Sequence, residues 1–168
     1  MSLKNCFKFL VLSVLFLTAC EGDEEAVENK ELEKKLIGEW RNVSLKLTMN
    51  TFSNKDSTKV FEVNEEDWER KMNIRPIKTI YFADGTYISE HRNLRDSIIY
   101  SPAGRWVILG DTVIMRDTFP ELGLSYRYKI NINKDLVEFT GIEDCDRDGS
   151  ADDQYFGVQR KQKFRGAK

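Results

Sequence analysis

The chain has 168 residues, of which 26 are Lys or Arg and 28 are Asp or Glu, and its formal net charge at pH 7 is −2. The two signs are interspersed and no basic stripe forms, which argues against a nucleic acid as partner. A chain of this length is expected to form one domain.

The first 19 residues have the zones of a secretory signal peptide: a cationic start, an apolar run over residues 9–17 and a few small residues. The apolar run is too short to cross a bilayer as a helix. Its end, "LTAC", resembles the lipobox of bacterial lipoproteins, in which the chain is cut before a cysteine that then carries lipid. The resemblance predicts a signal peptide over residues 1–19, a lipid on Cys20 and anchoring to a membrane of the cell envelope. An ordinary signal peptide with an incidental cysteine is the alternative.

Residues 20–35 are dense in charge and poor in large apolar side chains. Such a segment cannot bury enough surface to fold alone, so we expect a tether. Its start, "EGDEE", resembles the acidic signals that send some Bacteroidetes lipoproteins to the cell surface. The outer membrane is therefore the expected location, and its periplasmic face and its surface face are both alternatives. If Cys6 is removed and Cys20 is lipidated, Cys145 has no partner for a disulfide within the chain.

From residue 36 onward, apolar and polar residues alternate with a period of two, most clearly in "LSYRYKINI". Eight strands are expected, near residues 40–49, 77–82, 86–92, 103–109, 112–117, 124–132, 136–142 and 154–161. Asp84-Gly85 and Gly110-Asp111 suit tight hairpin turns. Antiparallel neighbours joined by hairpins favour an eight-stranded up-and-down barrel over residues 36–162, because closure removes exposed edges. A β-sandwich is the structural alternative, and residues 163–168 form a tail.

One stretch, residues 50–76, breaks this alternation. Within it, "NEEDWERKM" has the pattern of a short helix, with Asn64 as its N-cap and acidic residues in its first turn. Trp68 is expected to point inward. The barrel therefore carries a short helix in its first long connection.

The opening of the first strand, "IGEWRNVS", contains Gly38-x-Trp40. This resembles the Gly-x-Trp signature of lipocalins and of bacterial lipocalin-like lipoproteins. The repeated hairpin pattern of those lipoproteins also resembles two segments of this chain, "YFADGTYI" and "PAGRWVILGDTVIM". The resemblance covers about residues 36–161. It implies that Trp40 closes the bottom of the barrel and that a cation of the last strand, Arg160 or failing that Lys161, packs across its face. The long first connection and the missing disulfide depart from the family pattern.

The resemblance also implies a small, mostly apolar ligand held inside the barrel. Trp106, Tyr126 and Tyr128 are the wall residues we expect to contact it, although alternation alone leaves open which face points inward. The alternative is a barrel filled by its own side chains, which serves as a non-catalytic structural or interaction protein of the envelope.

The segment "DCDRDGSADD", residues 144–153, lies between the last two expected strands. Its oxygen-bearing residues follow the order of a calcium loop: Asp144, Asp146, Asp148, Ser150, Asp152 and Asp153. Tyr155 stands where an EF-hand has its bidentate glutamate, and no flanking helix is expected. An Asp-rich turn without metal is the alternative.

Nothing in the sequence indicates catalysis. His91 is the only histidine, and no nucleophile turn accompanies it. The acidic neighbours of Cys145 should raise its pKa, which disfavours a nucleophilic thiolate. We therefore predict a protein that is not an enzyme, with Ca²⁺ in the acidic loop as the one candidate cofactor. A hydrolase is the third alternative, and it would need His91 and a carboxylate to converge in one cleft.

Overall fold

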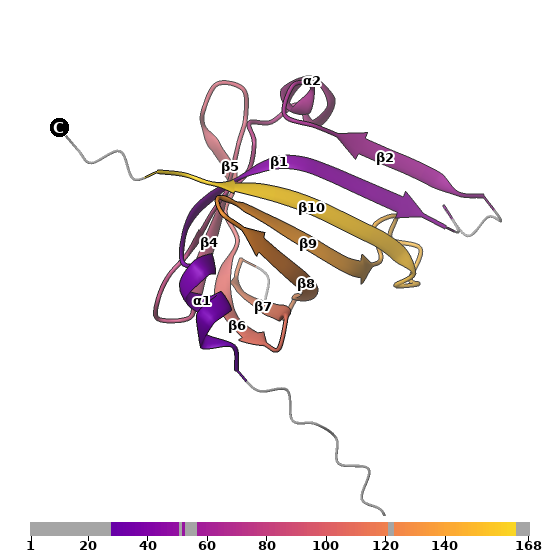
Figure 1. Cartoon of the computed structure of the whole chain (residues 1–168). Coiled ribbons are helices and arrows are strands. Elements are labelled where there is room, and N and C mark those ends of the chain that lie inside the picture. Colours follow the sequence, from indigo (N-terminus) through magenta and orange to yellow (C-terminus); the bar gives the residue numbers. More distant parts are fainter. Residues whose placement is uncertain (1–27, 51, 53–56, 121–122, 164–168) are drawn as a thin grey trace, which may run out of the picture.

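The computed structural model describes residues 28–50, 52, 57–120 and 123–163 (Figure 1). It contains two short helices and ten strands: α1 (Lys30–Leu36), β1 (Gly38–Met49), β2 (Lys59–Val63), α2 (Trp68–Met72), β3 (Lys78–Tyr81), β4 (Thr86–Arg92), β5 (Ile98–Tyr100), β6 (Ala103–Leu109), β7 (Thr112–Phe119), β8 (Ser125–Asn133), β9 (Leu136–Glu143) and β10 (Asp153–Lys161). Neither described helix is both long and apolar enough to cross a bilayer.

Eight of the strands form a closed antiparallel barrel. Neighbours follow the order β10, β9, β8, β7, β6, β4, β3, β1, and β1 pairs with β10 from Trp40 opposite Lys161 to Thr48 opposite Gln154. This closure confirms the predicted all-β up-and-down barrel and excludes the sandwich. β2 and β5 were not predicted. β2 pairs with the second half of β1, and β5 pairs with β4 outside the barrel path.

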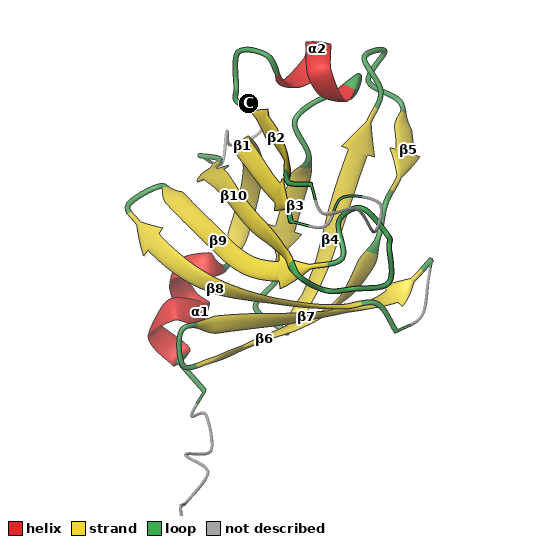
Figure 2. Cartoon of the chain, turned by 90° about the vertical axis from the view of Figure 1, so that its right-hand side faces the viewer, coloured by secondary structure: helices red, strands yellow, loops and turns green. Residues whose placement is uncertain are grey.

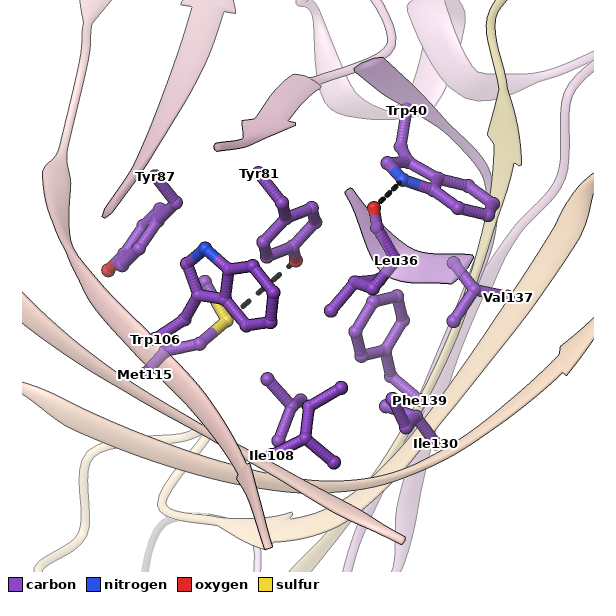
Figure 3. Close-up of a cluster of buried hydrophobic side chains, with 11 residues drawn as sticks. Leu36, Trp40, Tyr81, Tyr87, Trp106, Ile108, Met115, Ile130, Val137 and Phe139 are labelled. Atoms are coloured by element: carbon purple, nitrogen blue, oxygen red, sulfur yellow. Dashed lines mark hydrogen bonds between the residues drawn. The ribbon is translucent and has the colours of Figure 1, made fainter. Parts of the chain in front are cut away.

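One end of the barrel is filled by side chains. A buried cluster there combines Leu36 and Trp40 with residues of the surrounding strands: Tyr81, Tyr87, Trp106, Ile108, Val113, Met115, Ile130, Val137 and Phe139. Figure 3 shows these side chains pointing toward one another across the barrel. We refer to the end where Leu36, Trp40, Ile108 and Val137 lie as the closed end.

The closed end is covered by α1, so residues 30–35 of the expected tether are helical, whereas its residues 20–27 lie outside the described residues and stay a prediction. Asn29 caps the helix by accepting a hydrogen bond from the Leu32 amide at 3.1 Å, and its own side-chain amide donates to the Gly110 carbonyl at 2.9 Å. Leu36, the last residue of α1, is completely buried. Figure 2 shows α1 at one end of the barrel and α2 toward the other. Residues 30–36 therefore fold as a helix because the barrel supplies the apolar surface that the helix lacks.

The predicted helix in the first long connection is confirmed as α2, but its N-cap is Asp67 rather than Asn64. Asn64 instead accepts hydrogen bonds from the amides of Glu66 and Asp67, at 3.0 and 3.2 Å, and so closes the turn before the helix. Trp68 is completely buried, as predicted.

Candidate functional site

A cavity of about 220 Å³ lies inside the barrel, between the filled closed end and the opposite end. Its lining residues come from strands around the whole barrel and from the β5 loop: Asn42, Ile77, Thr79, Tyr81, Tyr87, Ser89, His91, Tyr100, Pro102, Met115, Asp117, Tyr126, Tyr128, Phe139, Tyr155 and Gln159. Tyr100 is 37% exposed, so the cavity reaches the surface beside β5. The wall mixes aromatic rings with polar groups, and is more polar than we expected from the sequence.

Two of the three ligand-contacting residues that we expected line this cavity. Tyr126 and Tyr128 stand two positions apart on β8, and their rings stack with centroids 6.3 Å apart and planes at 10°. Trp106 does not line it. Its indole is buried in the closed-end cluster and its Nε1 donates to the Thr86 carbonyl at 2.8 Å, which makes Trp106 part of the packed core.

Tyr128 is the centre of an aromatic group on the β8 to β10 side of the cavity. The ring of Tyr155 lies 4.7 Å from it and that of Phe139 lies 6.0 Å from it, almost perpendicular. Glycine at 157 leaves room for Tyr155, because a Cβ there would stand 2.7 Å from the Tyr155 hydroxyl. Burial raises the pKa of Tyr155 to about 12 and raises that of Tyr128 further above its ordinary value. Both phenols are therefore neutral hydrogen-bond donors at pH 7.

Polar side chains interrupt the apolar wall in three places. Asp117 is buried and accepts a hydrogen bond from the Tyr87 hydroxyl. The hydroxyls of Thr79 and Ser89 lie 2.6 Å apart. These groups come from β7, β4 and β3, at positions where alternation points them inward.

The third polar group is a pair of amides between β1 and β10. The Nε2 atom of Gln159 donates to Oδ1 of Asn42 at 3.3 Å. The Oε1 atom of Gln159 is buried and, within the described part of the chain, accepts no hydrogen bond. A buried polar atom of this kind is normally satisfied, and this one belongs to a residue that lines the cavity.

His91 also lines the cavity, with its ring edge-on to Tyr100 at 5.2 Å. Burial lowers the pKa of His91 below its ordinary value of 6.5. The imidazole is therefore neutral at pH 7 and contributes no positive charge to the cavity.

The predicted closure of the barrel involves Trp40, but with Lys161 rather than Arg160. Trp40 is completely buried and its Nε1 donates to the Leu36 carbonyl at 2.6 Å. The Nζ of Lys161 lies 5.1 Å from the centre of the Trp40 ring and donates to the Lys35 carbonyl at 2.7 Å. Arg160 points the other way and pairs with Glu65 at 2.8 Å. Adjacent residues of a strand face opposite sides, so only one of these two cations could reach the indole.

Gly38 makes this closure sterically feasible. Its φ of +131° is a conformation that residues with a side chain rarely adopt, and a Cβ there would stand 2.9 Å from Cε of Lys161. The aliphatic part of the Lys161 side chain therefore packs against the backbone of Gly38, beside the Trp40 ring.

The acidic loop, residues 144–152, connects β9 to β10. Backbone amides of the loop donate to two carboxylates: Cys145 to Asp153, the first residue of β10, at 2.7 Å, and Asp148 and Gly149 to Asp144 at 3.0 Å each. Carboxylate oxygens of Asp144, Asp146 and Asp153 lie within 4.8 Å of one another. These three of the six expected calcium ligands thus converge. Among the described acidic side chains, Asp148 and Asp152 do not belong to this group.

Comparison with known proteins gave no assignment for this chain. No protein-family model and no curated protein matched it. The site is therefore interpreted from its own geometry.

The lipidation residue, Cys20, lies outside the described residues, and its modification stays a prediction. Cys145, by contrast, is half-buried, and burial followed by the charge of Asp153 raises the pKa of its thiol to about 11. The direction agrees with the sequence-based expectation, although burial contributes more than the acidic neighbours.

Sequence reasoning missed Asp117 and Gln159. The signal was present in the alternation, because Asp117 shares a strand face with the buried Val113 and Met115, and Gln159 shares one with Tyr155. A polar residue in the inward phase of an otherwise apolar strand face indicates a lined cavity or a buried hydrogen-bond network.

Proposed function

We propose that this protein is a lipid-anchored protein of the cell envelope that binds one small ligand inside its barrel. The cavity of about 220 Å³ within a closed barrel is the observation that carries the proposal. Small barrels can be filled entirely by their own side chains, so an interior that keeps this space open is best explained by an occupant.

The cavity volume limits the size of the ligand. An apolar cavity of about 150 Å³ holds a benzene molecule, whereas sites for drug-sized ligands have volumes of about 300–1,000 Å³. A volume of about 220 Å³ therefore suits a molecule with a single substituted ring or a short branched chain, and is too small for a long acyl chain. The mixed wall favours a ligand with both apolar and polar groups over the mostly apolar one that we first expected.

Ligand binding can be tested by native mass spectrometry of the gently extracted protein, followed by a thermal-shift screen of single-ring compounds. Ser89→Phe, which adds a ring at a cavity-lining position of β4, should abolish both a co-purifying mass and the thermal shifts. Ile88→Phe, on the outward face of the same strand, is the matched control. A protein that carries no small molecule and responds to no compound would contradict ligand binding.

The proposed anchor rests on the "LTAC" motif and on the charged residues 20–27 that connect it to the folded part of the chain. Two or three acyl chains hold a protein on a membrane stably, whereas one holds it only marginally. Cys20→Ala should move the protein from the membrane fraction to the soluble fraction, and Cys145→Ala should not. Membrane attachment that survives Cys20→Ala would argue against lipidation. The outer membrane remains the expected location.

The acidic loop adds a second component to this proposal, a weak Ca²⁺ site that stabilises the β9–β10 connection. The convergence of Asp144, Asp146 and Asp153 supports it. Calcium takes six to eight oxygen ligands, so loop carbonyls or water would have to supply the rest. The expected affinity is that of extracellular modules, with a Kd of roughly 10⁻⁴ to 10⁻³ M.

A non-catalytic interaction protein is the second candidate function. Ile98 and Ile99 on β5 are 51% and 56% exposed, and the described contacts pair this strand only with β4. An exposed apolar edge strand is a surface on which another protein could dock. Chemical crosslinking in intact cells, compared between the natural protein and an Ile98→Ser, Ile99→Ser variant, would test this function. Crosslinked products that do not depend on these two residues would count against it.

A further inference from the structure

The chemical character of the cavity follows from its five inner tyrosines and one carboxylate. Four strands contribute the phenol rings: Tyr81, Tyr87, Tyr126, Tyr128 and Tyr155. The face of an aromatic ring carries partial negative charge and attracts cations, most effectively where water is excluded.

Asp117 adds a carboxyl group to the same wall. It is only 2% exposed and accepts a hydrogen bond from Tyr87. Among the residues that the structure describes, no lysine or arginine lines the cavity, and His91 is neutral at pH 7. Burying a carboxylate is costly unless a cation or several hydrogen bonds compensate it. The wall therefore offers negative potential and does not supply the positive charge that would balance it.

Gln159 provides an independent indication of a ligand. Its Nε2 is used by Asn42, while its buried Oε1 accepts nothing within the described residues. Buried acceptors are normally satisfied, and Gln159 lines the cavity, so its amide is the partner we assign to an N–H or O–H group of a ligand. Asp117 and Gln159 thus both call for a donor, although they lie on different strands, β7 and β10.

We propose that the ligand of this cavity is a small organic amine, bound as its ammonium ion beside Asp117 and the tyrosine rings. This inference rests on the proposed function, since it requires that the cavity binds a ligand at all. The ammonium ion pairs with the carboxylate and contacts the ring faces, and a further N–H or O–H group of the ligand donates to Gln159. The apolar part of the molecule packs against Met115 and Phe139.

Three probes of matched size test the sign of the charge: 2-phenylethylamine, 2-phenylethanol and phenylacetate. Calorimetric titration of the purified full-length protein at pH 7 should rank the amine tightest, by about tenfold or more over the alcohol, with the acid weakest. Equal or tighter binding of the alcohol or the acid would overturn the amine inference and leave the proposed ligand-binding function intact. No binding of any probe would overturn the inference, and a protein that also lacks a co-purifying molecule would overturn both.

Asp117→Asn tests the carboxylate itself. Asparagine has the same shape and can still accept the hydrogen bond from Tyr87, so the cavity should keep its form. Amine affinity should fall about tenfold to a hundredfold, while binding of 2-phenylethanol should stay unchanged and serve as the check on folding. Glu138→Gln, an exposed position on β9, removes the same charge from the outside of the barrel and should leave both affinities unchanged. Undiminished amine binding by Asp117→Asn would refute the assignment, and the probe series with the natural protein does not depend on this variant folding.

Discussion

Leu36→Ala measures how much the closed end contributes to stability. Leu36 is completely buried where α1 meets the barrel, and its carbonyl accepts the Trp40 indole N–H. Alanine keeps that carbonyl and the helix but removes the apolar side chain. Leu→Ala changes in packed cores cost about 2–5 kcal/mol, and the strands around this position are hydrogen-bonded on both sides and cannot collapse easily into the space. We therefore expect a loss of about 3 kcal/mol.

Urea denaturation followed by tryptophan fluorescence measures this loss. For a domain of this size the free energy of unfolding falls by about 2 kcal/mol per molar urea, so the midpoint should drop by about 1.5 M. Lys34→Ala is the matched control on the same helix, since Lys34 is exposed and the change should stay within about 0.5 kcal/mol. A drop below about 0.5 M for Leu36→Ala would show that α1 does not pack on the barrel as described.

Three further predictions address the closure, the half-buried carboxyl of Glu143 on β9 and the acidic loop. Gly38→Ala should cost about 1–3 kcal/mol, because of its positive φ and the close approach of Lys161; a neutral effect in the same urea assay would contradict the described closure. Burial raises the pKa of Glu143 above its ordinary 4.5, although the Tyr128 hydroxyl partly opposes this. The folded state then binds the proton more tightly than the unfolded state, so the contribution of Glu143 to stability is greatest below pH 4.5 and is lost as the pH rises through the folded-state pKa. Glu143→Gln should therefore stabilise the protein at pH 7 and lose this advantage below pH 4.5, and urea midpoints at both pH values check it. Millimolar Ca²⁺, but not Mg²⁺, should raise the melting temperature through residues 144–153, and an unchanged temperature would speak against the site.

The eight barrel strands were predictable because each has one face toward the interior and one toward solvent. Such strands show alternating apolar and polar residues in the sequence. β2 and β5 were not predicted because they lack a clear alternation of this kind. β5 is exposed along its whole length, and the five residues of β2 carry too short a pattern. α1 was missed because its composition is that of a tether, although Leu32 and Leu36, four residues apart, mark a helix face that packs on the barrel.

The site was predictable only in part. Tyr126 and Tyr128 belonged to the clearest alternating strand, whereas Trp106 has the same inward phase and yet lies in the packed core. Alternation tells which side chains point inward, but not how far along the barrel the interior is filled. The choice between Arg160 and Lys161 depends on the register between β1 and β10, which shifts by a bulge between Asn42 and Ser44.

The pairing of β1 with β10 has a consequence for folding kinetics. Asn42 and Gln159 face each other across that seam although they are 117 residues apart in the chain. Contacts between such distant segments form late, because the entropy of closing the loop opposes them until the rest of the sheet exists. During synthesis or export, the edge of β1 that pairs with β10 therefore stays unpaired until β10 has emerged. A chain truncated before Asp153 should lose its cooperative unfolding transition, and a truncated chain that still unfolds cooperatively would show that the first nine strands form a stable unit without the seam.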